Sequence, residues 1–209
     1  MSDLPGRSDE LVAVLAESRR RGLLGPAEPE EHVRHAAGFI GDLVDGARVV
    51  DLGSGGGVPG LVLACARPDL HLTLVDAASR RCEVLRWAVD ALDAGSRVEV
   101  MHGRAEDLAR SPLHRERHDA VVARLFGPPA VTAECARGFL RSGGVLVVSE
   151  PPSMTEAERW PVDGLGRLGF GPATARESMG AGFVAMAAVG VCPEGVPRRA
   201  GVPARRPRF

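Results

Sequence analysis

Apolar residues follow two alternating patterns along most of the chain. Short apolar runs typical of buried strands are separated by stretches in which apolar residues recur every three or four positions, as on one face of a helix. The predicted strands cover residues 48–52, 70–75, 98–102, 120–123, 144–149 and 183–189. The predicted helices cover residues 8–21, 30–44, 58–66, 79–94, 129–140 and 155–168. This order predicts an α/β fold with a doubly wound, mainly parallel sheet and short N-terminal helices.

A glycine-rich segment follows the first predicted strand. From Asp51 to Gly60 the chain reads DLGSGGGVPG, and a second acid, Asp76, follows the next predicted strand. Glycine tolerates positive φ and lets backbone N–H groups approach a ligand, and the helix predicted from Val58 directs its positive N-terminal end to the same place. Ligands of such sheets bind beyond the carboxyl ends of the strands. These residues therefore predict a site for a nucleotide-type cofactor.

The order of one acid, the glycines and a second acid resembles the first two motifs of S-adenosylmethionine-dependent methyltransferases. The alternative is a nicotinamide-dependent dehydrogenase, because residues 55–60 also satisfy G-x-G-x-x-G, which is a weak motif alone. Against that alternative, the chain has no Tyr and no Lys for the proton-transfer pair of the small dehydrogenases. Only about 150 residues follow the loop, too few for a second domain. A turn that merely caps a helix would require only one glycine.

Composition narrows the class of protein. All 26 basic residues are Arg, and the formal net charge of -1 gives no global attraction to a polyanion. The four cysteines lie far apart without a Cys-x-x-Cys motif, which is typical of reduced, mostly buried thiols. No apolar run reaches transmembrane length, and the N-terminus lacks the apolar core of a signal peptide. We expect a cytoplasmic monomer that has no contact with a membrane.

The loops after the predicted strands are expected to share the cofactor. The backbone of the glycine loop would approach its methionine and ribose part, Asp51 would anchor loop amides or the amino group, and Val58 would supply an apolar contact. The glycines concerned are Gly53, Gly55 and Gly57. Asp76 is placed to accept hydrogen bonds from both ribose hydroxyls, since a carboxylate has two acceptor oxygens.

Each of two further loops has two alternative roles. Ala105 and Glu106 would read the adenine edge, and the alternative is a simple helix N-terminus with favourable acids. Arg124, after the fourth predicted strand, would contact the cofactor and position the methyl acceptor in the transfer pocket, or is a solvated loop cation. No metal site is expected, because His32 and His35 share a helix face without a Cys or acid cluster to complete one.

More motifs make the resemblance specific. Residues 51–63, Asp76 after Leu-Val, residues 102–106 and Arg124 are similar to the bacterial 16S ribosomal RNA guanine-N7 methyltransferases, the glucose-inhibited division protein B family. The chain's two ends resemble the family as well, through residues 21–26 with His35 and through the Pro- and Arg-rich residues 197–207. The resemblance implies S-adenosylmethionine as cofactor and 16S rRNA or the small ribosomal subunit as partner.

The chain departs from the family's pattern at three polar positions. Glu150 and two prolines replace a Lys-Gly pair after the fifth strand, residues 180–182 replace an Arg before the last strand, and Gly38-Phe39 replace Asp-Ser after the N-terminal His. Two lost positions are cationic, and their loss would weaken phosphate contacts to RNA. A divergent paralogue that methylates a small molecule, and a cofactor-binding protein without catalysis, therefore stay open.

We expect three parts, namely an N-terminal helical extension (1–45), the methyltransferase domain (46–192) and a basic tail (193–209). The tail carries five arginines from residue 197 onward and is expected to be extended and solvated when free. It would either contact RNA or pack back on the domain through Phe209. Trp87 is expected in the core, and Trp160 is expected to pack rather than to stack on a base.

Overall fold

The computed structural model describes residues 8–151 and 159–209, and its centre is a seven-stranded sheet. The strands are β1 (Arg48–Leu52), β2 (His71–Asp76), β3 (Val98–His102), β4 (His118–Ala123), β5 (Leu140–Glu150), β6 (Thr174–Ser178) and β7 (Ala181–Ala187). Their order is β3-β2-β1-β4-β5-β7-β6. The first five strands pair in parallel, whereas β7 is antiparallel to both β5 and β6. The order in which successive strands are added reverses between β1 and β4, and ligands of doubly wound sheets bind at such a point.

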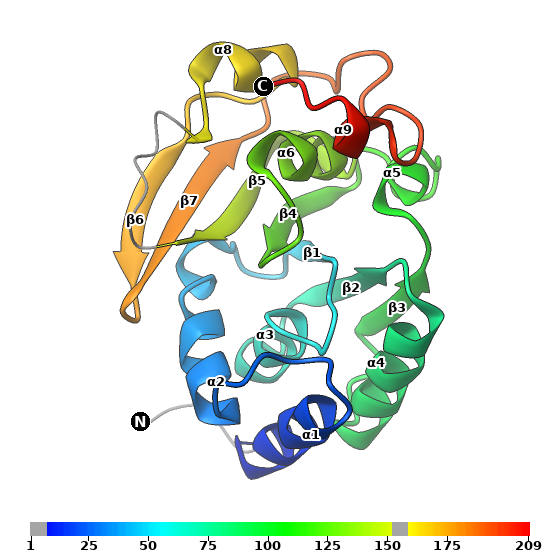
Figure 1. The fold of residues 1–209 in the computed structure, drawn as a ribbon, viewed down its shortest axis with the longest axis vertical. Helices are drawn as coiled ribbons and strands as arrows, with labels where there is room; N and C mark the ends of the chain where they lie inside the picture. Colours follow the sequence, from blue (N-terminus) through cyan, green and yellow to red (C-terminus); the bar gives the residue numbers. More distant parts are fainter. Residues whose placement is uncertain (1–7, 152–158) are drawn as a thin grey trace.

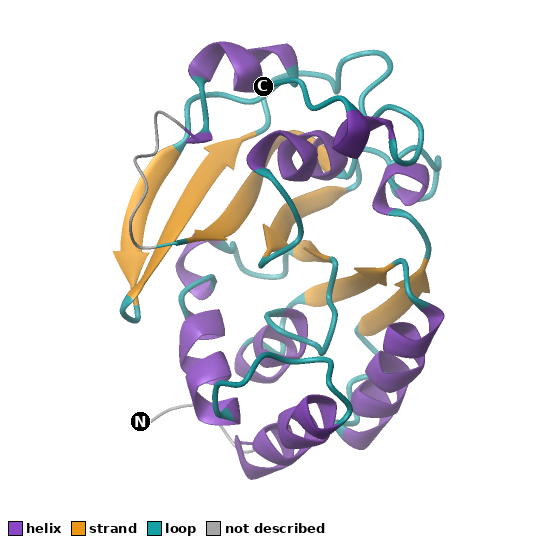
Figure 2. Ribbon diagram, in the orientation of Figure 1, coloured by secondary structure: helices purple, strands orange, loops and turns teal. Residues whose placement is uncertain are grey.

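Helices cover both faces of this sheet. They are α1 (Ser8–Arg20), α2 (Pro29–Ala37), the 3-10 turn η1 (Ile40–Asp42), α3 (Gly60–Ala66), α4 (Ser79–Ala91), α5 (Ala105–Leu108), α6 (Pro129–Arg137), α8 (Val162–Arg167) and α9 (Val202–Arg205). In the view of Figure 1, α1 to α4 lie in the lower half and α5, α6, α8 and α9 in the upper half. Figure 2 shows the sheet running between these two groups.

Successive strand residues belong to two different hydrophobic cores. Val49 packs with α1 to α4, whereas Val50 packs with α5, α6 and α8. The same alternation holds in β4, where Val122 joins the first core and Val121 the second. Side chains of a strand point alternately to the two faces of a sheet, so a strand buried on both faces is apolar throughout. The N-terminal helices share the first core with α3 and the strands.

The structure confirms the predicted α/β fold and corrects several boundaries. The second helix was expected to reach residue 44, but it ends at Ala37. A Cβ at Gly38 would lie 2.3 Å from the Phe183 ring, so the close approach of β7 requires glycine there. The helix expected to reach residue 140 ends at Arg137, because Leu140 already pairs with His118 as part of β5.

Other predictions need similar corrections near the C-terminus. Strand β6 was missed, and β7 begins two residues earlier than expected. The helix predicted over 155–168 lies partly outside the described residues, and its described part is α8. Of the four cysteines, Cys82, Cys135 and Cys192 are buried, as expected. Among the residues that the structure describes, no helix has both the length and the apolarity needed to cross a membrane.

Candidate functional site

The turn between β1 and α3 depends on glycine for two different reasons. Gly53, Gly55 and Gly57 all have positive φ, at 76°, 55° and 100°. A Cβ at Gly53 would lie 2.6 Å from the Phe126 ring, and a Cβ at Gly57 would lie 2.3 Å from Leu61. At Gly55 the nearest atom would be 3.7 Å away, so the protein itself leaves room there. The first and third glycines are thus required by packing, whereas the middle one leaves the loop backbone accessible to a ligand.

Hydrogen bonds of Asp51 connect the start of this turn to the start of α3. Its Oδ2 accepts a hydrogen bond of 2.9 Å from the Gly60 N–H, and its backbone oxygen accepts one of 3.0 Å from Ser54 Oγ. Its other carboxylate oxygen is buried and accepts no hydrogen bond from the described residues. Burial raises the pKa of Asp51 to about 7, although the Gly60 N–H opposes the shift. A buried carboxylate oxygen without a donor is suited to a cationic group of a ligand.

Asp76, at the end of β2, holds the neighbouring part of the turn. Its Oδ2 accepts a hydrogen bond of 3.0 Å from the Gly55 N–H, and its Oδ1 accepts one of 2.9 Å from the Ala78 N–H. Arg81 approaches Oδ2 at 3.5 Å. Asp76 therefore fixes the loop backbone, and each oxygen keeps a lone pair for a further donor such as a hydroxyl.

The loop after β3 places Glu106 against the C-terminal segment. Ala105 opens α5 and is buried, and Glu106 is only 2% exposed. Its Oε1 accepts hydrogen bonds of 2.9 Å from both Arg104 Nη2 and the Gly201 N–H. Burial alone would raise the pKa of Glu106, but these donors leave it below its usual value. The side chain thus has structural partners, and adenine recognition at Ala105 and Glu106 stays a prediction.

Arg124 follows β4, so it lies across from the glycine loop at the point where the strand order reverses. Its Nη2 donates a hydrogen bond of 3.1 Å to Nδ1 of His32 on α2. Burial lowers the pKa of Arg124, and the charge of Asp51 opposes that shift. The pKa of His32 is also lowered, first by burial and then by the Arg124 charge. The same two causes lower the pKa of His35 to about 4. Arg124 is therefore a half-buried cation beside two neutral histidines, not a solvated loop residue.

The sequence alone did not predict that these histidines lie at the site. Their spacing on one helix face was recognised, but the contact with Arg124 depends on α2 folding back over the end of β4. The residue after Arg124 was also missed: Leu125 is 90% exposed with φ of 57°. Few non-glycine residues adopt that conformation, and such residues cluster at functional sites.

The segment before α2 covers the glycine loop. A Cβ at Gly56 would lie 2.6 Å from the Leu24 side chain and 2.7 Å from the Leu23 carbonyl oxygen. The N-terminal part therefore contributes both a covering segment and His32 to the site. In Figure 1 the chain between α1 and α2 crosses in front of α3 accordingly.

Known proteins resemble this chain in sequence over most of its length. The sequence model described as rRNA small subunit methyltransferase G matches residues 11–156. The protein named ribosomal RNA small subunit methyltransferase G from Symbiobacterium thermophilum is 35% identical, over 91% of this chain and 84% of its own length. The protein of the same name from Rubrobacter xylanophilus is 33% identical, over 95% and 82% of the two chains. The chain belongs to the rRNA small subunit methyltransferase G family.

Solved structures agree on the fold of this methyltransferase. An S-adenosylmethionine-dependent O-methyltransferase from Thermotoga maritima superimposes with a TM-score of 0.61 at 17% identity, over 87% of this chain and 73% of that one. An O-methyltransferase from Bacillus cereus, crystallised with S-adenosylhomocysteine, superimposes with a TM-score of 0.59 at 17% identity, over 88% and 93%. At such identities the likeness shows the fold alone.

S-adenosylmethionine is the cofactor of this methyltransferase, and the residues present fit it. The buried Asp51 oxygen without a donor suits the ammonium group, and Asp76 keeps lone pairs for the ribose hydroxyls. Gly55 leaves its loop accessible, and Val58 is buried at the turn before α3. Arg124 lies close enough for its charge to act on Asp51. The individual contacts to the cofactor stay predictions.

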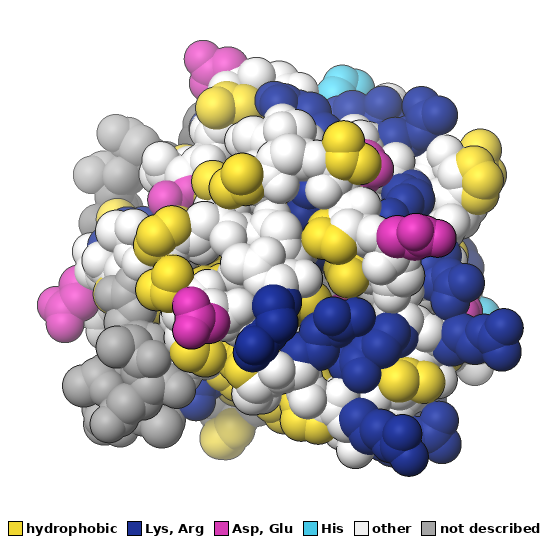
Figure 3. Space-filling view, turned by 90° about the horizontal axis from the view of Figure 1, so that it is seen from above, with side chains coloured by type: hydrophobic (Ala, Val, Ile, Leu, Met, Phe, Trp, Pro, Cys, Tyr) yellow, Lys and Arg dark blue, Asp and Glu magenta, His cyan; other side chains and the backbone are white. Residues whose placement is uncertain are grey.

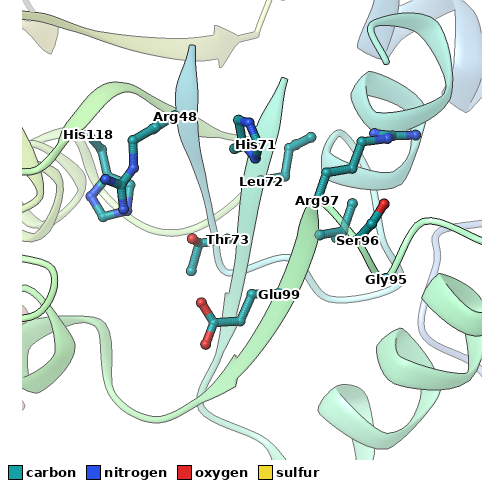
Figure 4. A pocket seen from close by; sticks show the side chains of 10 residues that line it. Arg48, His71, Leu72, Thr73, Gly95, Ser96, Arg97, Glu99 and His118 are labelled. Carbon is teal, nitrogen blue, oxygen red and sulfur yellow. The ribbon is translucent and has the colours of Figure 1, made fainter. Parts of the chain in front are cut away.

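A cavity lies at the amino ends of the strands, opposite the glycine loop. It has a volume of about 410 Å³ and is lined in part by Arg48, His71, Arg97, Glu99 and His118. Figure 4 shows Arg48 and His118 on one side of it and Arg97 on the other. Within residues 8–151 and 159–209, no group of three or more His, Cys, Asp or Glu residues could hold a metal ion.

Proposed function

We propose that this methyltransferase transfers the methyl group of S-adenosylmethionine to N7 of a guanine in 16S ribosomal RNA within the small ribosomal subunit. The observation that carries the proposal is the likeness, over nearly the whole chain, to proteins named ribosomal RNA small subunit methyltransferase G. The protein would act as a monomer in the cytoplasm. It would consist of the extension, domain and tail defined by residues 1–45, 46–192 and 193–209.

The chemistry of guanine N7 suits the groups at this site. S-adenosylmethionine supplies an electrophilic methyl group on a sulfonium centre. N7 carries a lone pair and no proton, so its attack requires no general base, only alignment with the methyl–sulfur bond and exclusion of water. His32 is buried, His35 is half-buried, and both are held neutral, which suits positioning. Arg124 would orient the base from the loop after β4, while Leu23 and Leu24 exclude water from the glycine loop.

Methylation of a small molecule is the second candidate, and one observation favours it. Glu150 stands where the family's pattern has a Lys-Gly pair, and its carboxylate is occupied by Trp160 Nε1 at 3.1 Å and Arg159 Nε at 2.5 Å. This position therefore supplies no cation for an RNA phosphate, so RNA affinity has to come from other residues.

One experiment separates these functions. The protein is incubated with labelled S-adenosylmethionine and small ribosomal subunits from a strain that lacks its own guanine-N7 methyltransferase of this family. We expect label in 16S rRNA, at a single guanine located by cleavage at N7-methylguanine. Asp76→Ala is the matched negative control, because it removes the acceptor of the Gly55 N–H. Binding of S-adenosylhomocysteine without any transfer to RNA would refute the proposal.

A further inference from the structure

The C-terminal segment is anchored by a fully buried carboxylate. Glu134, on α6, is 0% exposed, and its Oε1 accepts hydrogen bonds from the Arg198 N–H at 2.9 Å and from Arg198 Nε at 2.7 Å. Its Oε2 accepts one from Arg198 Nη2 at 2.6 Å and lies 3.7 Å from Arg208 Nε. A bidentate Arg–carboxylate pair has a defined geometry, and breaking a buried pair costs several kcal/mol. The segment is therefore a fixed part of the domain.

Two further contacts hold the same segment. The Gly201 N–H donates to the buried Glu106, next to the loop expected to bind adenine. Phe209 packs on α8, where a Cβ at Gly164 would lie 2.4 Å from its ring. These contacts support the alternative in which Phe209 packs back on the domain, whereas the expectation of an extended, solvated tail concerned the free segment.

Anchoring the segment divides its five arginines into two groups. Arg198 and Arg208 are occupied by Glu134, whereas Arg199, Arg205 and Arg206 are exposed. Arg110, just beyond α5, is exposed beside them, and with Arg199 it lines a cavity of about 550 Å³. The cavity is completed by Asp107, Ser111 and Ala200. Within the described part of the chain, these four exposed arginines make no ion pair.

One side of the molecule is rich in exposed cations. Seen from above, arginine side chains gather over the face that carries α9 and the C-terminal segment (Figure 3). The formal net charge of -1 shows that the chain has no overall excess of cations. Exposed guanidinium groups without an ion-pair partner can donate to the phosphate oxygens of a nucleic-acid backbone, and the anchored segment fixes the backbone that carries three of them.

We propose that Arg110, Arg199, Arg205 and Arg206 form an arginine platform that binds backbone phosphates of the ribosomal RNA substrate. This proposal rests on the proposed function and deepens it. The platform supplies the cations that Glu150 and residues 180–182 do not. Because Gly201 is bonded to Glu106, the RNA would be held close to the cofactor loop. The role of the buried carboxylates is to position the segment, not to contact RNA.

The test compares two variants with the same loss of charge. R199Q/R205Q/R206Q removes three platform cations and keeps Arg198 and Arg208 on Glu134. R34Q/R48Q/R86Q removes three exposed arginines from α2, the start of β1 and α4. Binding to a 16S rRNA transcript is measured at several salt concentrations, together with thermal unfolding and S-adenosylhomocysteine affinity.

We expect the platform variant to bind the transcript at least tenfold more weakly in about 0.1 M salt. Its salt slope should fall by roughly two, at about 0.7–0.9 per lost phosphate contact. Thermal unfolding and S-adenosylhomocysteine affinity should match the parent, and the control variant should keep the parent's slope. An unchanged salt slope in the platform variant, with a parent that still methylates RNA, would overturn the platform alone. A parent that neither binds nor methylates RNA would overturn the proposed function as well. A platform variant with normal RNA binding but altered unfolding would show that the arginines are only structural.

Discussion

Arg124 donates a hydrogen bond of 3.1 Å to His32, across 92 residues of sequence. The acceptor is Nδ1, which accepts only in a neutral ring that carries its proton on Nε2. Burial and the Arg124 charge keep the His32 pKa below its usual value, so the ring is neutral at physiological pH. Helix α2 thereby fixes the Arg124 guanidinium, whose charge acts on Asp51. His32 is a positioning residue for Arg124.

Removing the acceptor should therefore impair transfer more than cofactor binding. His32→Leu leaves a half-buried cation without its partner, which costs about 1.5–3 kcal/mol and corresponds to a loss of roughly tenfold or more in kcat. His32→Asn offers an oxygen near the position of Nδ1 and should restore most of the activity. Steady-state methyl transfer to small ribosomal subunits measures both. Equal losses in the two variants, or a loss confined to the KM for S-adenosylmethionine, would contradict the positioning role.

Asp51 should couple cofactor binding to pH. Its pKa is raised to about 7 by burial, so near neutral pH it is partly protonated, whereas a cationic cofactor favours the carboxylate. We expect the affinity for S-adenosylmethionine to rise between pH 6 and pH 8, with release of a proton that calorimetry in two buffers detects. Asp51→Asn should bind more weakly and lose this pH dependence.

The same group affects stability with a defined sign. The folded pKa of Asp51 lies above its unfolded value of 3.8, so its contribution to the free energy of unfolding is complete below about pH 4. It is lost at up to about 1.4 kcal/mol per pH unit as the pH rises to about 7. Asp51→Asn should therefore gain stability relative to the parent from pH 5 to pH 8 in chemical denaturation. A constant difference between the two proteins would show that Asp51 does not titrate in this range.

Gly55 and Gly46 provide a matched pair for testing the cofactor loop. Both have positive φ, at 55° and 67°, and both would admit a Cβ without a protein clash. Gly55→Ala and Gly46→Ala should each cost about 1–2 kcal/mol of stability through backbone strain. Only Gly55→Ala should also weaken S-adenosylhomocysteine binding, because Gly46 precedes β1 at the other end of the strand. Calorimetry and denaturation measure the two effects, and equal affinities would place the ligand away from this loop.

Sequence patterns predicted the strands that have an apolar or alternating pattern and missed the one that has neither. The central strands β1, β2, β4 and β5 follow from runs such as Val49-Val50, and the edge strand β3 follows from its alternating valines, whereas the edge strand β6 reads Thr-Ala-Arg-Glu-Ser and gives no such signal. It is held by Arg176, which bonds to Asp42 and lies 4.9 Å from the Phe183 ring centre. Such a contact joins residues 134 positions apart, which no local pattern reports.

The positions of single side chains also depend on packing that local sequence patterns do not report. Trp160 is buried as expected, but Trp87 was wrongly expected in the core. It is 39% exposed, and it contacts Arg21, whose guanidinium lies over the ring at 5.3 Å. Asp51, Asp76 and the glycines were found because their motif is contiguous. His32 was not assigned to the site, since its role depends on where α2 packs.

Leu125 offers a test of whether backbone strain at the site serves the substrate. Its φ is 57° and its side chain is 90% exposed, so packing within the protein does not account for its strained backbone. Met179, in the turn between β6 and β7, has a φ of 53° and is 58% exposed, which makes it the matched control. Glycine removes about 1–2 kcal/mol of strain at such a position, offset by about 0.5–1 kcal/mol of unfolded-state entropy. Leu125→Gly and Met179→Gly should therefore both fold with unchanged or slightly higher stability.

Their activities should differ. Leu125 adjoins Arg124 and presents an apolar side chain to the solvent where the RNA base would enter. Leu125→Gly should therefore lower methyl transfer to small ribosomal subunits by about tenfold or more. This factor corresponds to the roughly 1.5–3 kcal/mol gained when a Leu side chain is buried. Met179→Gly should retain full transfer, and both variants should bind S-adenosylhomocysteine like the parent. Transfer that is equally high in both variants would mean that the exposed Leu125 side chain does not contact the substrate. A stability loss in Leu125→Gly alone would instead assign this residue to the fold.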